Sequence, residues 1–256
     1  MTKTVGIIQV RLDSTRLPKK ALKEIVGKPM IAHLIERIKE SKKLDEIIVA
    51  TTDDKSDDEV VNVIEKLKIP VFRGSNEDVL DRYFQAAKKY NADVIVRITG
   101  DCPLIDPTVV DELVEYYNNN DFDYVSNTIK PTYPDGLCVE VLSFKALEKA
   151  WNQAELLSER EHVTPYITKH PEIFKIKNIE NSVDLSDLRW CVDQQEDLDF
   201  VKEVFKSLYN KDYVFHMEEI LELLDKNPDL KKINTGIQRN EGYIKSLKED
   251  RKIKKG

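Results

Sequence analysis

Four cations stand close together near the start of the chain. Arg11, Arg16, Lys19 and Lys20 fall within ten residues, directly after the apolar stretch IIQV at residues 7–10, although the formal net charge of the chain is −7. A local cluster of opposite sign indicates an anionic ligand. Arginine offers a planar fork and lysine a point charge to phosphate oxygens, so the loop predicts a polyphosphate site. The alternative is a solvated basic surface turn.

This loop lacks the two best-known phosphate-binding patterns. It contains no glycine-rich run ending in GK[ST] and no GxGxxG, which excludes a Walker loop and a Rossmann fingerprint. Phosphates would therefore be held by the cationic side chains together with backbone amides of the loop.

Two aspartates follow predicted strands and could hold a metal ion. Asp101 lies in RITGDCPLID after an apolar run, and Asp193 lies in WCVDQQEDL, between a strand expected at 189–192 and a helix expected at 194–208. In an open α/β sheet, ligands bind beyond the carboxyl ends of the strands, where carboxylates suit Mg²⁺ shared with phosphates. Asp101 could instead occupy a plain turn, and Asp193 could be the N-cap of the helix. The neighbouring Cys102 is better explained as a small buried residue than as a nucleophile.

The elements that must position these residues alternate through the first 130 residues. Short β-branched runs predict strands covered on both faces, and apolar positions at helical spacing predict amphipathic helices between them. The strands are expected at residues 5–10, 46–50 and 93–98, and the helices at residues 30–40, 57–67 and 75–90. Expected helix starts are capping boxes from Ser56 and Ser75 and an Asp106-Pro107 pair. This alternation predicts an α/β fold with a parallel sheet.

The second half of the chain is less regular. Strands are expected at residues 138–142, 174–179 and 189–192, and helices at residues 143–157, 159–170 and 194–208. From Met217 onward the chain becomes polar, and residues 248–256 are expected to fray. The simplest division is one α/β domain over residues 1–215 with a C-terminal helical extension over residues 216–256.

Composition narrows the class of protein. Hydrophobic residues make up 41% and charged residues 34% of the 256 residues, which is typical of a globular protein, and the acidic balance argues against nucleic-acid binding. No apolar run approaches the ~20 residues that cross a bilayer, and the first residues lack the plan of a signal peptide. The three widely spaced cysteines, Cys102, Cys138 and Cys191, favour reduced thiols in a cytoplasmic protein over a metal site.

Several motifs in order along the chain carry a family resemblance. They are RLDSTRLPKKAL, GKPMIAHLIERI, DEIIVATTDD, GDCPLIDP, YPDGLCVEVLS, SEREHVTPYI, LRWCVDQQEDL and INTGIQRNEGY. Together they resemble the cytidylyltransferase superfamily of the acylneuraminate and CMP-KDO synthetase type, especially its spore-coat polysaccharide branch. The resemblance implies a Rossmann-like, three-layer nucleotidyltransferase fold with a mostly parallel central sheet. It also implies a Mg²⁺-dependent enzyme that transfers CMP from CTP to a sugar acid or related acceptor, and a homodimer.

The resemblance also implies roles for individual residues. It implies catalytic roles for Arg11, Arg16, Lys20 and Asp101, and metal binding by Asp101 and Asp193. Nucleotide binding falls to Gln9, Arg11, Ser14, Arg16, Lys20, Arg73, Ser75 and Thr99, with Thr99 near the base. Acceptor binding falls to Glu140, Arg160 and His162. Alternatives from the residues are solvent exposure for Glu140, a structural role for His162, and a surface salt-bridge cluster around Arg73.

Two departures from the family pattern leave other functions open. Asp13 and Lys19 stand where family loops usually carry glycine, which allows positive φ and close backbone approach. A non-catalytic nucleotide-binding relative is therefore one alternative, although the Lys19 charge could partly offset Asp13. A nucleotide-sugar glycosyltransferase is another, but such enzymes typically hold metal through Asp-x-Asp, and GDCP has a single acidic residue.

Overall fold

The computed structural model describes residues 2–253, and its centre is a seven-stranded sheet. The strands are β1 (Thr4–Gln9), β4 (Glu46–Thr52), β5 (Val71–Gly74), β6 (Val94–Thr99), β7 (Tyr124–Ser126), β8 (Glu140–Ser143) and β9 (Ile176–Asn178). Their order is β5-β4-β1-β6-β8-β7-β9. Only β8 pairs antiparallel with its neighbours. The predicted mostly parallel α/β sheet is confirmed.

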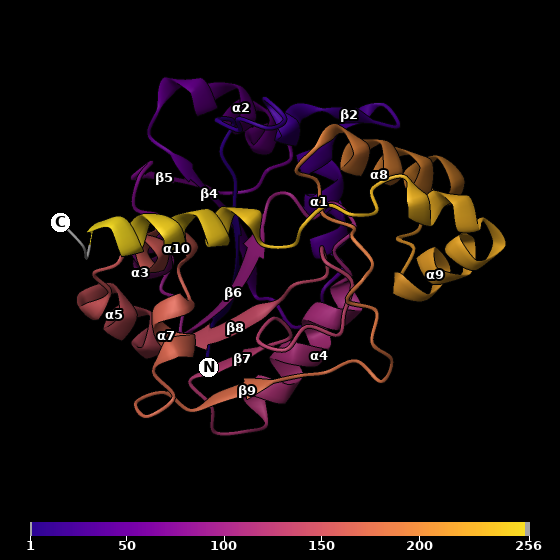
Figure 1. The fold of residues 1–256 in the computed structure, drawn as a ribbon. Helices are drawn as coiled ribbons and strands as arrows, with labels where there is room; N and C mark the ends of the chain where they lie inside the picture. The colour runs from indigo at the N-terminus through magenta and orange to yellow at the C-terminus, as the bar shows by residue number, and fades with distance from the viewer. Residues whose placement is uncertain (1, 254–256) are drawn as a thin grey trace.

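Helices cover both faces of the sheet and make three layers (Figure 1). One face packs against α1 (Met30–Ile38), α2 (Asp58–Lys66), α4 (Pro107–Asn118), α8 (Gln195–Leu208) and α9 (Met217–Lys226). The other packs against α3 (Val79–Lys89), α5 (Phe144–Gln153) and α7 (Pro165–Lys169). Side chains alternate along each strand: Val5 and Ile7 of β1 lie in the α3-side core, whereas Ile8 lies in the α1-side core.

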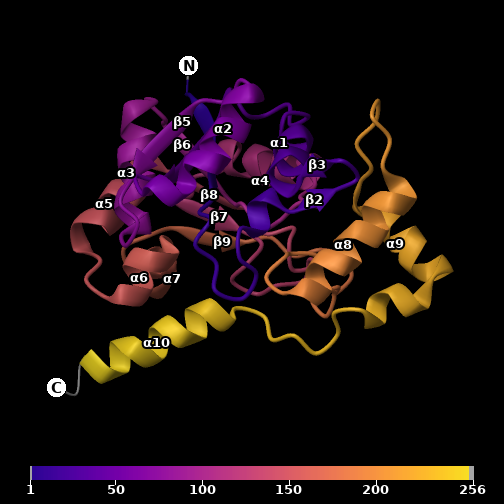
Figure 2. The ribbon, with the colours of Figure 1, turned by 90° about the horizontal axis from the view of Figure 1, so that it is seen from above.

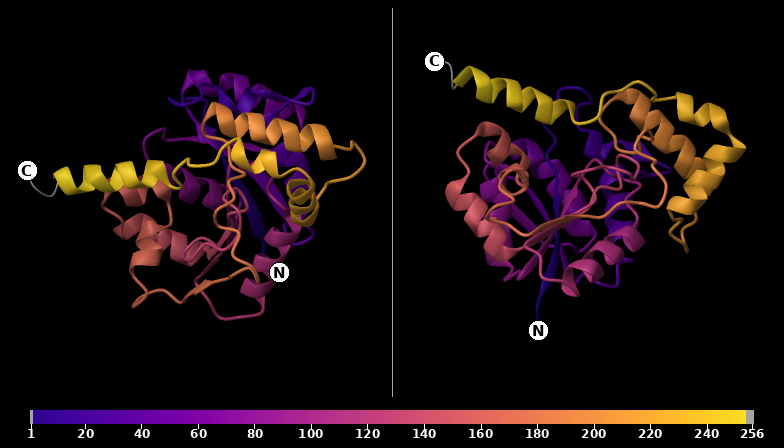
Figure 3. Two further views of the ribbon diagram at one scale, coloured as in Figure 1. Left: turned by 45° about the vertical axis from the view of Figure 1, so that its right-hand side comes forward. Right: turned by 60° about the horizontal axis from the view of Figure 1, so that its bottom comes forward.

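The remaining elements are short connections and the C-terminal helix. They are η1 (Lys20–Leu22), β2 (Glu24–Ile25), β3 (Lys28–Pro29), η2 (Lys55–Asp57), α6 (Leu157–His162), η3 (Pro228–Lys232) and α10 (Glu241–Ile253). Figure 2 shows α10 and its preceding segment along one side of the molecule, and Figure 3 shows the chain's N-terminus at the opposite end of the sheet. The final segment therefore crosses the carboxyl edge of the parallel strands. None of the helices within residues 2–253 combines the length and apolar character needed to cross a membrane.

Residues 217–253 are integrated with the rest of the fold. Ile220 and Leu224 of α9 are fully buried in the α1-side core. At α10, the carboxylate of Asp250 accepts a hydrogen bond from the backbone N–H of Ser158, 3.2 Å away at the start of α6. Residues 248–253 are helical, so the expected fraying is wrong there, and residues 254–256 lie outside the described part. The division at residue 215 stays a prediction.

Local departures from the predicted elements concentrate around polar contacts. Residues 189–192 form no strand, since Arg189 makes only an isolated bridge with Asp135. The helix expected at 159–170 is two helices, α6 and α7, separated at Val163, whose φ of 72° no helix accommodates. Ser56 does not cap α2, because Asp54 instead caps the short η2 before it. The predicted cap at Asp106 is confirmed, its side chain accepting from Thr108 N–H.

Candidate active site

The basic loop after β1 is held against β4 by a buried carboxylate. Asp57 is 1% exposed and accepts from the backbone N–H of Leu12 at 2.7 Å. Its other oxygen accepts from the Thr51 hydroxyl at 2.8 Å and from the backbone N–H of Thr52 at 3.1 Å. Because buried carboxylates are stable only when their oxygens are hydrogen-bonded, Asp57 fixes where the loop starts. Sequence reasoning missed this residue, which it assigned only to a helix start.

Lys20 lies between the two predicted metal-binding aspartates. Its Nζ is 3.1 Å from Asp101 Oδ2, 2.6 Å from Asp193 Oδ1 and 2.8 Å from the carbonyl oxygen of Val192. Burial alone would lower the pKa of Lys20, but the two carboxylates outweigh it and raise that pKa. Burial would raise the pKa of Asp101, yet the Lys20 ammonium holds it below its usual range. Lys20 and Asp101 therefore stay charged near neutral pH.

Close backbone packing brings residues 189–193 beside Asp101. The carbonyl oxygen of Asp101 accepts from the N–H of Val192 at 2.7 Å. Gly136 has φ of 118°, and a Cβ there would lie 2.6 Å from the carbonyl carbon of Trp190. Gly100 is similarly tight, since its Cβ would lie 2.6 Å from the Gln9 carbonyl oxygen. Two glycines thus allow segments distant in sequence to converge at the carboxyl ends of β1 and β6.

Arg189 holds Asp193 in place through a network that includes two further aspartates. Its Nη2 donates to Asp193 Oδ2 at 3.2 Å, its Nε to Asp197 Oδ1 at 2.9 Å, and its Nη1 to Asp135 Oδ2 at 3.0 Å. Asp197 also accepts from the backbone N–H of Asp193 at 2.9 Å. Asp193 is therefore not the N-cap of α8, which is Gln194. Sequence reasoning missed Arg189, because it assigned residues 189–192 to a strand and because one partner, Asp135, lies far away in the sequence.

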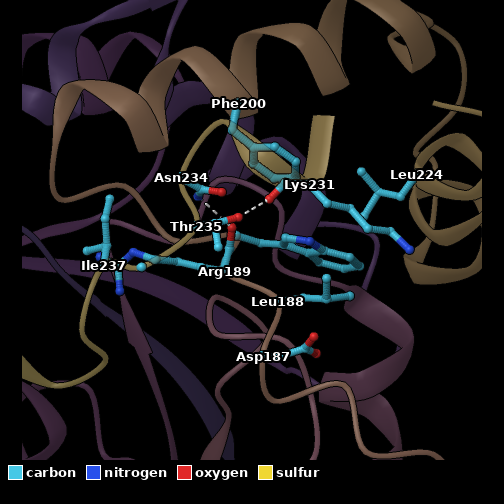
Figure 4. Close-up of a pocket in the computed structure, with 11 residues that line it drawn as sticks. Asp187, Leu188, Arg189, Phe200, Leu224, Lys231, Asn234, Thr235 and Ile237 are labelled. Atoms are coloured by element: carbon cyan, nitrogen blue, oxygen red, sulfur yellow. Dashed lines mark hydrogen bonds between the residues drawn. The ribbon is translucent and has the colours of Figure 1, made fainter. Parts of the chain in front are cut away.

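A small cavity borders Arg189. It is lined by parts of residues 187–190 and 231–237 together with Phe200 and Leu224 (Figure 4). Its volume of about 50 Å³ is room for only a few water molecules. Asn234 closes one side, donating to the carbonyl oxygen of Arg189 at 2.9 Å and to Asp197 Oδ1 at 3.0 Å. The cavity is too small for a nucleotide.

Arg16 joins this cluster from the basic loop, and its second partner comes from the C-terminal segment. Its Nη2 lies 3.1 Å from Asp193 Oδ2, and its Nη1 pairs with Glu241 at the start of α10. Arg11 is exposed and forms no ion pair within residues 2–253. Lys19 pairs with Glu59 rather than lying against Asp13. Lys19 has φ of 53°, so a lysine does occupy the conformation that favours glycine.

The remaining predicted nucleotide residues divide into two groups. Gln9 and Thr99 are direct neighbours in the β1–β6 register, at the carboxyl edge near Lys20. Ser14 lies within the basic loop, its N–H donating to the carbonyl oxygen of Leu12 at 2.9 Å. Arg73 instead binds the β4–α2 connection, donating to the carbonyl oxygens of Thr52 and Asp54 and pairing with Asp58. Ser75 accepts from the N–H of Asp78 at 3.0 Å. Arg73 and Ser75 are not brought to the Lys20 cluster.

The three predicted acceptor residues lie on the α3 side of the sheet. Glu140 is 5% exposed, pairs with Arg97, and accepts from the hydroxyls of Tyr124 and Thr164, each at 2.6 Å. The alternative of a solvent-exposed Glu140 is therefore wrong. Alternation does place it opposite Val139 and Val141, but that face is covered by α7 and α3.

Arg160 and His162 are held by other partners. Arg160 Nε donates to Asp78 Oδ2 at 2.9 Å, which joins α6 to the N-cap of α3. The His162 ring nitrogen Nε2 is 3.1 Å from the Ser246 hydroxyl of α10. Burial lowers the pKa of His162 to about 4, so its ring is neutral near pH 7. The alternative for Arg73, Asp78 and Arg82 was a surface salt-bridge cluster. Arg73 does form an ion pair, with Asp58, whereas Asp78 pairs with Arg160, so the three residues are not paired with one another.

Cys102, Ile167 and Phe174 are buried inside the protein. Cys102 is buried, and burial raises its pKa well above the usual range, which disfavours the reactive thiolate. Within residues 2–253, no group of three or more His, Cys, Asp or Glu side chains is arranged to hold a metal. Ile167 and Phe174 are buried in the protein's own core, so they provide no apolar surface for the expected homodimer, which stays a prediction.

The sheet topology and the Lys20 cluster define an α/β protein whose strand ends are suited to a polyphosphate. A family model described as cytidylyltransferase matches residues 5–240. The chain belongs to this family of nucleotide-transferring enzymes.

Individual relatives match this chain over nearly its full length. An uncharacterized protein of Methanocaldococcus jannaschii is 45% identical over 242 residues, covering 92% of this chain and 96% of the relative. The spore coat polysaccharide biosynthesis protein SpsF of Bacillus subtilis is 32% identical over 238 residues, covering 90% and 97%. A solved cytidylyltransferase structure from Leptospira borgpetersenii has a TM-score of 0.88 at 34% identity, covering 93% of this chain and 100% of that one. These likenesses confirm the predicted family and fold.

Proposed function

We propose that the protein transfers CMP from CTP to a sugar acid or related acceptor, with Mg²⁺, for the synthesis of a surface polysaccharide. The observation that supports this most directly is the position of Lys20 between Asp101 and Asp193, with Arg16 beside them. These groups lie where an open α/β sheet binds its ligands. Membership of the cytidylyltransferase family supports CTP as the nucleotide, and similarity to the spore coat polysaccharide biosynthesis protein SpsF supports a polysaccharide precursor as the product.

The reaction requires displacement at the α-phosphorus. An oxygen of the acceptor forms a bond to this phosphorus, the bond to the bridging β-oxygen breaks, and pyrophosphate leaves with the electron pair. The protein's share is in-line positioning and neutralisation of the charge that develops on the leaving group. Lys20, Arg16 and Arg11 supply the cations. All three ammonium donors of Lys20 are already used, so an arriving phosphate would take the place of one of these partners.

Asp101 and Asp193 are the residues that would hold Mg²⁺. Both are carboxylates that flank one ammonium, and their side chains remain 28% and 21% exposed. A metal ion would bind them in place of Lys20, which now pairs with both. Mg²⁺ commonly takes one or two protein carboxylates and completes its shell with phosphate and water, so a third protein ligand is not required. When bound, the ion would supply charge neutralisation between the nucleotide's phosphates.

Glu140, Arg160 and His162 are proposed to form the acceptor side. They lie on the α3 side of the sheet, beside the same carboxyl edge. His162 and Thr164 flank Val163, which forms a γ-turn: the N–H of Thr164 donates to the carbonyl oxygen of His162 at 2.8 Å. Strained backbone of this kind is frequent at ligand sites. A polar rim containing arginine and a neutral histidine suits an acceptor that carries a carboxylate and hydroxyl groups.

The test is release of pyrophosphate from CTP and Mg²⁺ with a panel of ulosonic acids, phosphorylated sugars and phosphorylated alcohols. Lys20→Gln should lower kcat by about a hundredfold or more. Lys23→Gln is the matched control, because Lys23 forms no ion pair within residues 2–253 and activity should be unchanged. Pyrophosphate release that ignores every acceptor, or turnover only with a nucleotide-sugar donor, would contradict the proposal.

A further inference from the structure

The first turns of α10 lie on two residues that are proposed to contact substrates. Glu241, the first residue of the helix, pairs with Nη1 of Arg16 from the basic loop. The Ser246 hydroxyl is 3.1 Å from Nε2 of His162, and the Tyr243 ring meets the His162 ring edge-on, with the centroids 5.1 Å apart. One helix therefore occupies a cation of the phosphate site and a histidine of the acceptor side at the same time.

Few buried groups hold α10 to the rest of the protein. It packs mainly against the short helix α6, on the outside of the molecule (Figure 2). Among residues 241–252, only Ser246 and Asp250 are buried, and both are polar. The preceding helix α9 differs, because its Ile220 and Leu224 are completely buried. Since burial of apolar surface is the main force that holds a helix to a domain, α10 should detach far more easily than α9.

The contact between α10 and α6 is also incompletely hydrogen-bonded. Asp250 Oδ1 accepts from the Ser158 N–H at 3.2 Å, but Asp250 Oδ2 and the Ser158 hydroxyl oxygen are buried without a partner within residues 2–253. Buried polar atoms without partners cost free energy that they regain in water. Packing α10 against α6 therefore carries a penalty, which lowers the free energy needed to open this contact.

Asn240 lies where a hinge for α10 would be. Before it, Arg239 is anchored to the body of the protein: its Nε lies 3.6 Å from Asp135 Oδ1 and its Nη2 lies 3.3 Å from the Cys138 sulfur. Asn240 itself has φ of 59°, and its carbonyl oxygen accepts from the Ile244 N–H at 3.0 Å. Hinges are commonly residues at the ends of elements that absorb a change of φ and ψ. A change at Asn240 would move α10 as a unit and leave Arg239 in place.

We propose that α10 is a lid, which is closed over Arg16 and His162 when no substrate is bound and is displaced when a triphosphate binds Arg16. The inference rests on the proposed function, which assigns both residues to substrates. The side chains of Arg16 and Glu241 are 38% and 35% exposed, so their ion pair is a weak one. A triphosphate carries several negative charges and meets Lys20 and Arg16 together, so it outcompetes the single carboxylate of Glu241. Release of Glu241 frees the start of α10 and uncovers His162.

Backbone hydrogen exchange of the full chain, measured by mass spectrometry, tests the lid. The probe is inorganic tripolyphosphate with Mg²⁺, and sodium sulfate at the same ionic strength controls for salt. Tripolyphosphate should speed exchange in residues 243–252 and leave α9 unchanged. Without any ligand, Glu241→Gln should speed exchange in residues 243–252 by about twofold to fivefold, the range expected for loss of one exposed ion pair.

Glu249→Gln is the matched control. Glu249 lies in the same helix and forms no ion pair within residues 2–253, so this variant loses the same charge without touching Arg16. Its exchange should match that of wild type, both with and without tripolyphosphate. Faster exchange in Glu249→Gln as large as in Glu241→Gln would assign the effect to the charge of the helix and refute the role of the Arg16 pair.

The remaining outcomes separate the lid from the proposed function. Bound tripolyphosphate with unchanged or slower exchange in α10, or unchanged exchange in unliganded Glu241→Gln, would refute the lid and make α10 a fixed wall of the site. Binding of tripolyphosphate by neither wild type nor Glu241→Gln would refute both proposals. Opening of α10 in a protein that releases no pyrophosphate from CTP with any acceptor would refute the proposed function and leave the lid standing. Pyrophosphate release while α10 stays protected in saturating CTP would do the reverse.

Discussion

Replacing Arg82 by methionine should stabilise the unliganded protein. The guanidinium is 2% exposed, and two of its donors lack partners. An uncompensated buried ion costs several kcal/mol, and exchanging buried charge for apolar side chains of similar volume can gain about 1–4 kcal/mol. Methionine is flexible enough to fill the space left by the arginine stem. A gain of about 2 kcal/mol in the free energy of unfolding corresponds to a rise in Tm of roughly 4–8 °C for a chain of this size.

Arg37→Met is the matched comparison. Arg37 is 3% exposed, like Arg82, but its donors reach the carbonyl oxygens of Ile105 and Phe215. Its removal leaves these acceptors buried without a donor, at about 1–3 kcal/mol each. Arg37→Met should therefore lower the free energy of unfolding by about 3–5 kcal/mol, while Arg82→Met raises it.

The measurement is urea unfolding followed by circular dichroism, with calorimetric Tm values, on both variants without nucleotide. Opposite signs for the two substitutions are expected. If Arg82→Met destabilises the protein as much as Arg37→Met does, Arg82 has structural partners.

Three further predictions concern the rest of the site. Arg189→Lys should lower kcat about tenfold or more with a small change in the KM for CTP, because one ammonium cannot orient Asp193 as the three-armed guanidinium does; an unchanged kcat would refute the positioning role. Glu241→Gln should tighten tripolyphosphate binding up to about fivefold, because it frees Arg16 from an ion pair, and the effect should weaken with salt. Weaker binding by this variant would instead show that Glu241 assists binding of the ligand. His162 has a pKa of about 4 in the fold and about 6.5 unfolded, so the unfolded chain takes up its proton first. Stability should therefore be complete above about pH 6.5 and fall toward pH 4; the pH dependence of His162→Asn in urea unfolding should be flatter over that window, and an identical curve would contradict the assignment.

The regular part of the fold could be predicted because its signals are local. β-branched runs and apolar faces at helical spacing mark the parallel half, and a cap such as Asp106 involves only its neighbours in sequence. Residues 189–192 misled the prediction for the same reason. Trp190 and Val192 are buried like strand residues, but the polar contacts of Arg189 hold the segment beside Asp101 rather than in the sheet. Burial alone cannot distinguish a strand from an extended segment packed beneath a helix.

The same distinction applies to the candidate site. Sequence reasoning finds residues that the topology positions and misses residues whose role depends on tertiary contacts. Asp101 follows β6 almost directly and Lys20 lies at the end of the loop after β1, so the topology brings them to the same edge of the sheet. Arg82 stands in a helix beside other charges, where a salt bridge is the ordinary expectation, and only the three-dimensional arrangement shows that Asp78 is taken by Arg160. A residue that lacks a partner in the fold cannot be recognised from its spacing in the sequence. Spacing indicates which side chains could interact, but not which of them already interact with another residue. Groups of that kind carry the information about the ligand, since the fold gives them no other use.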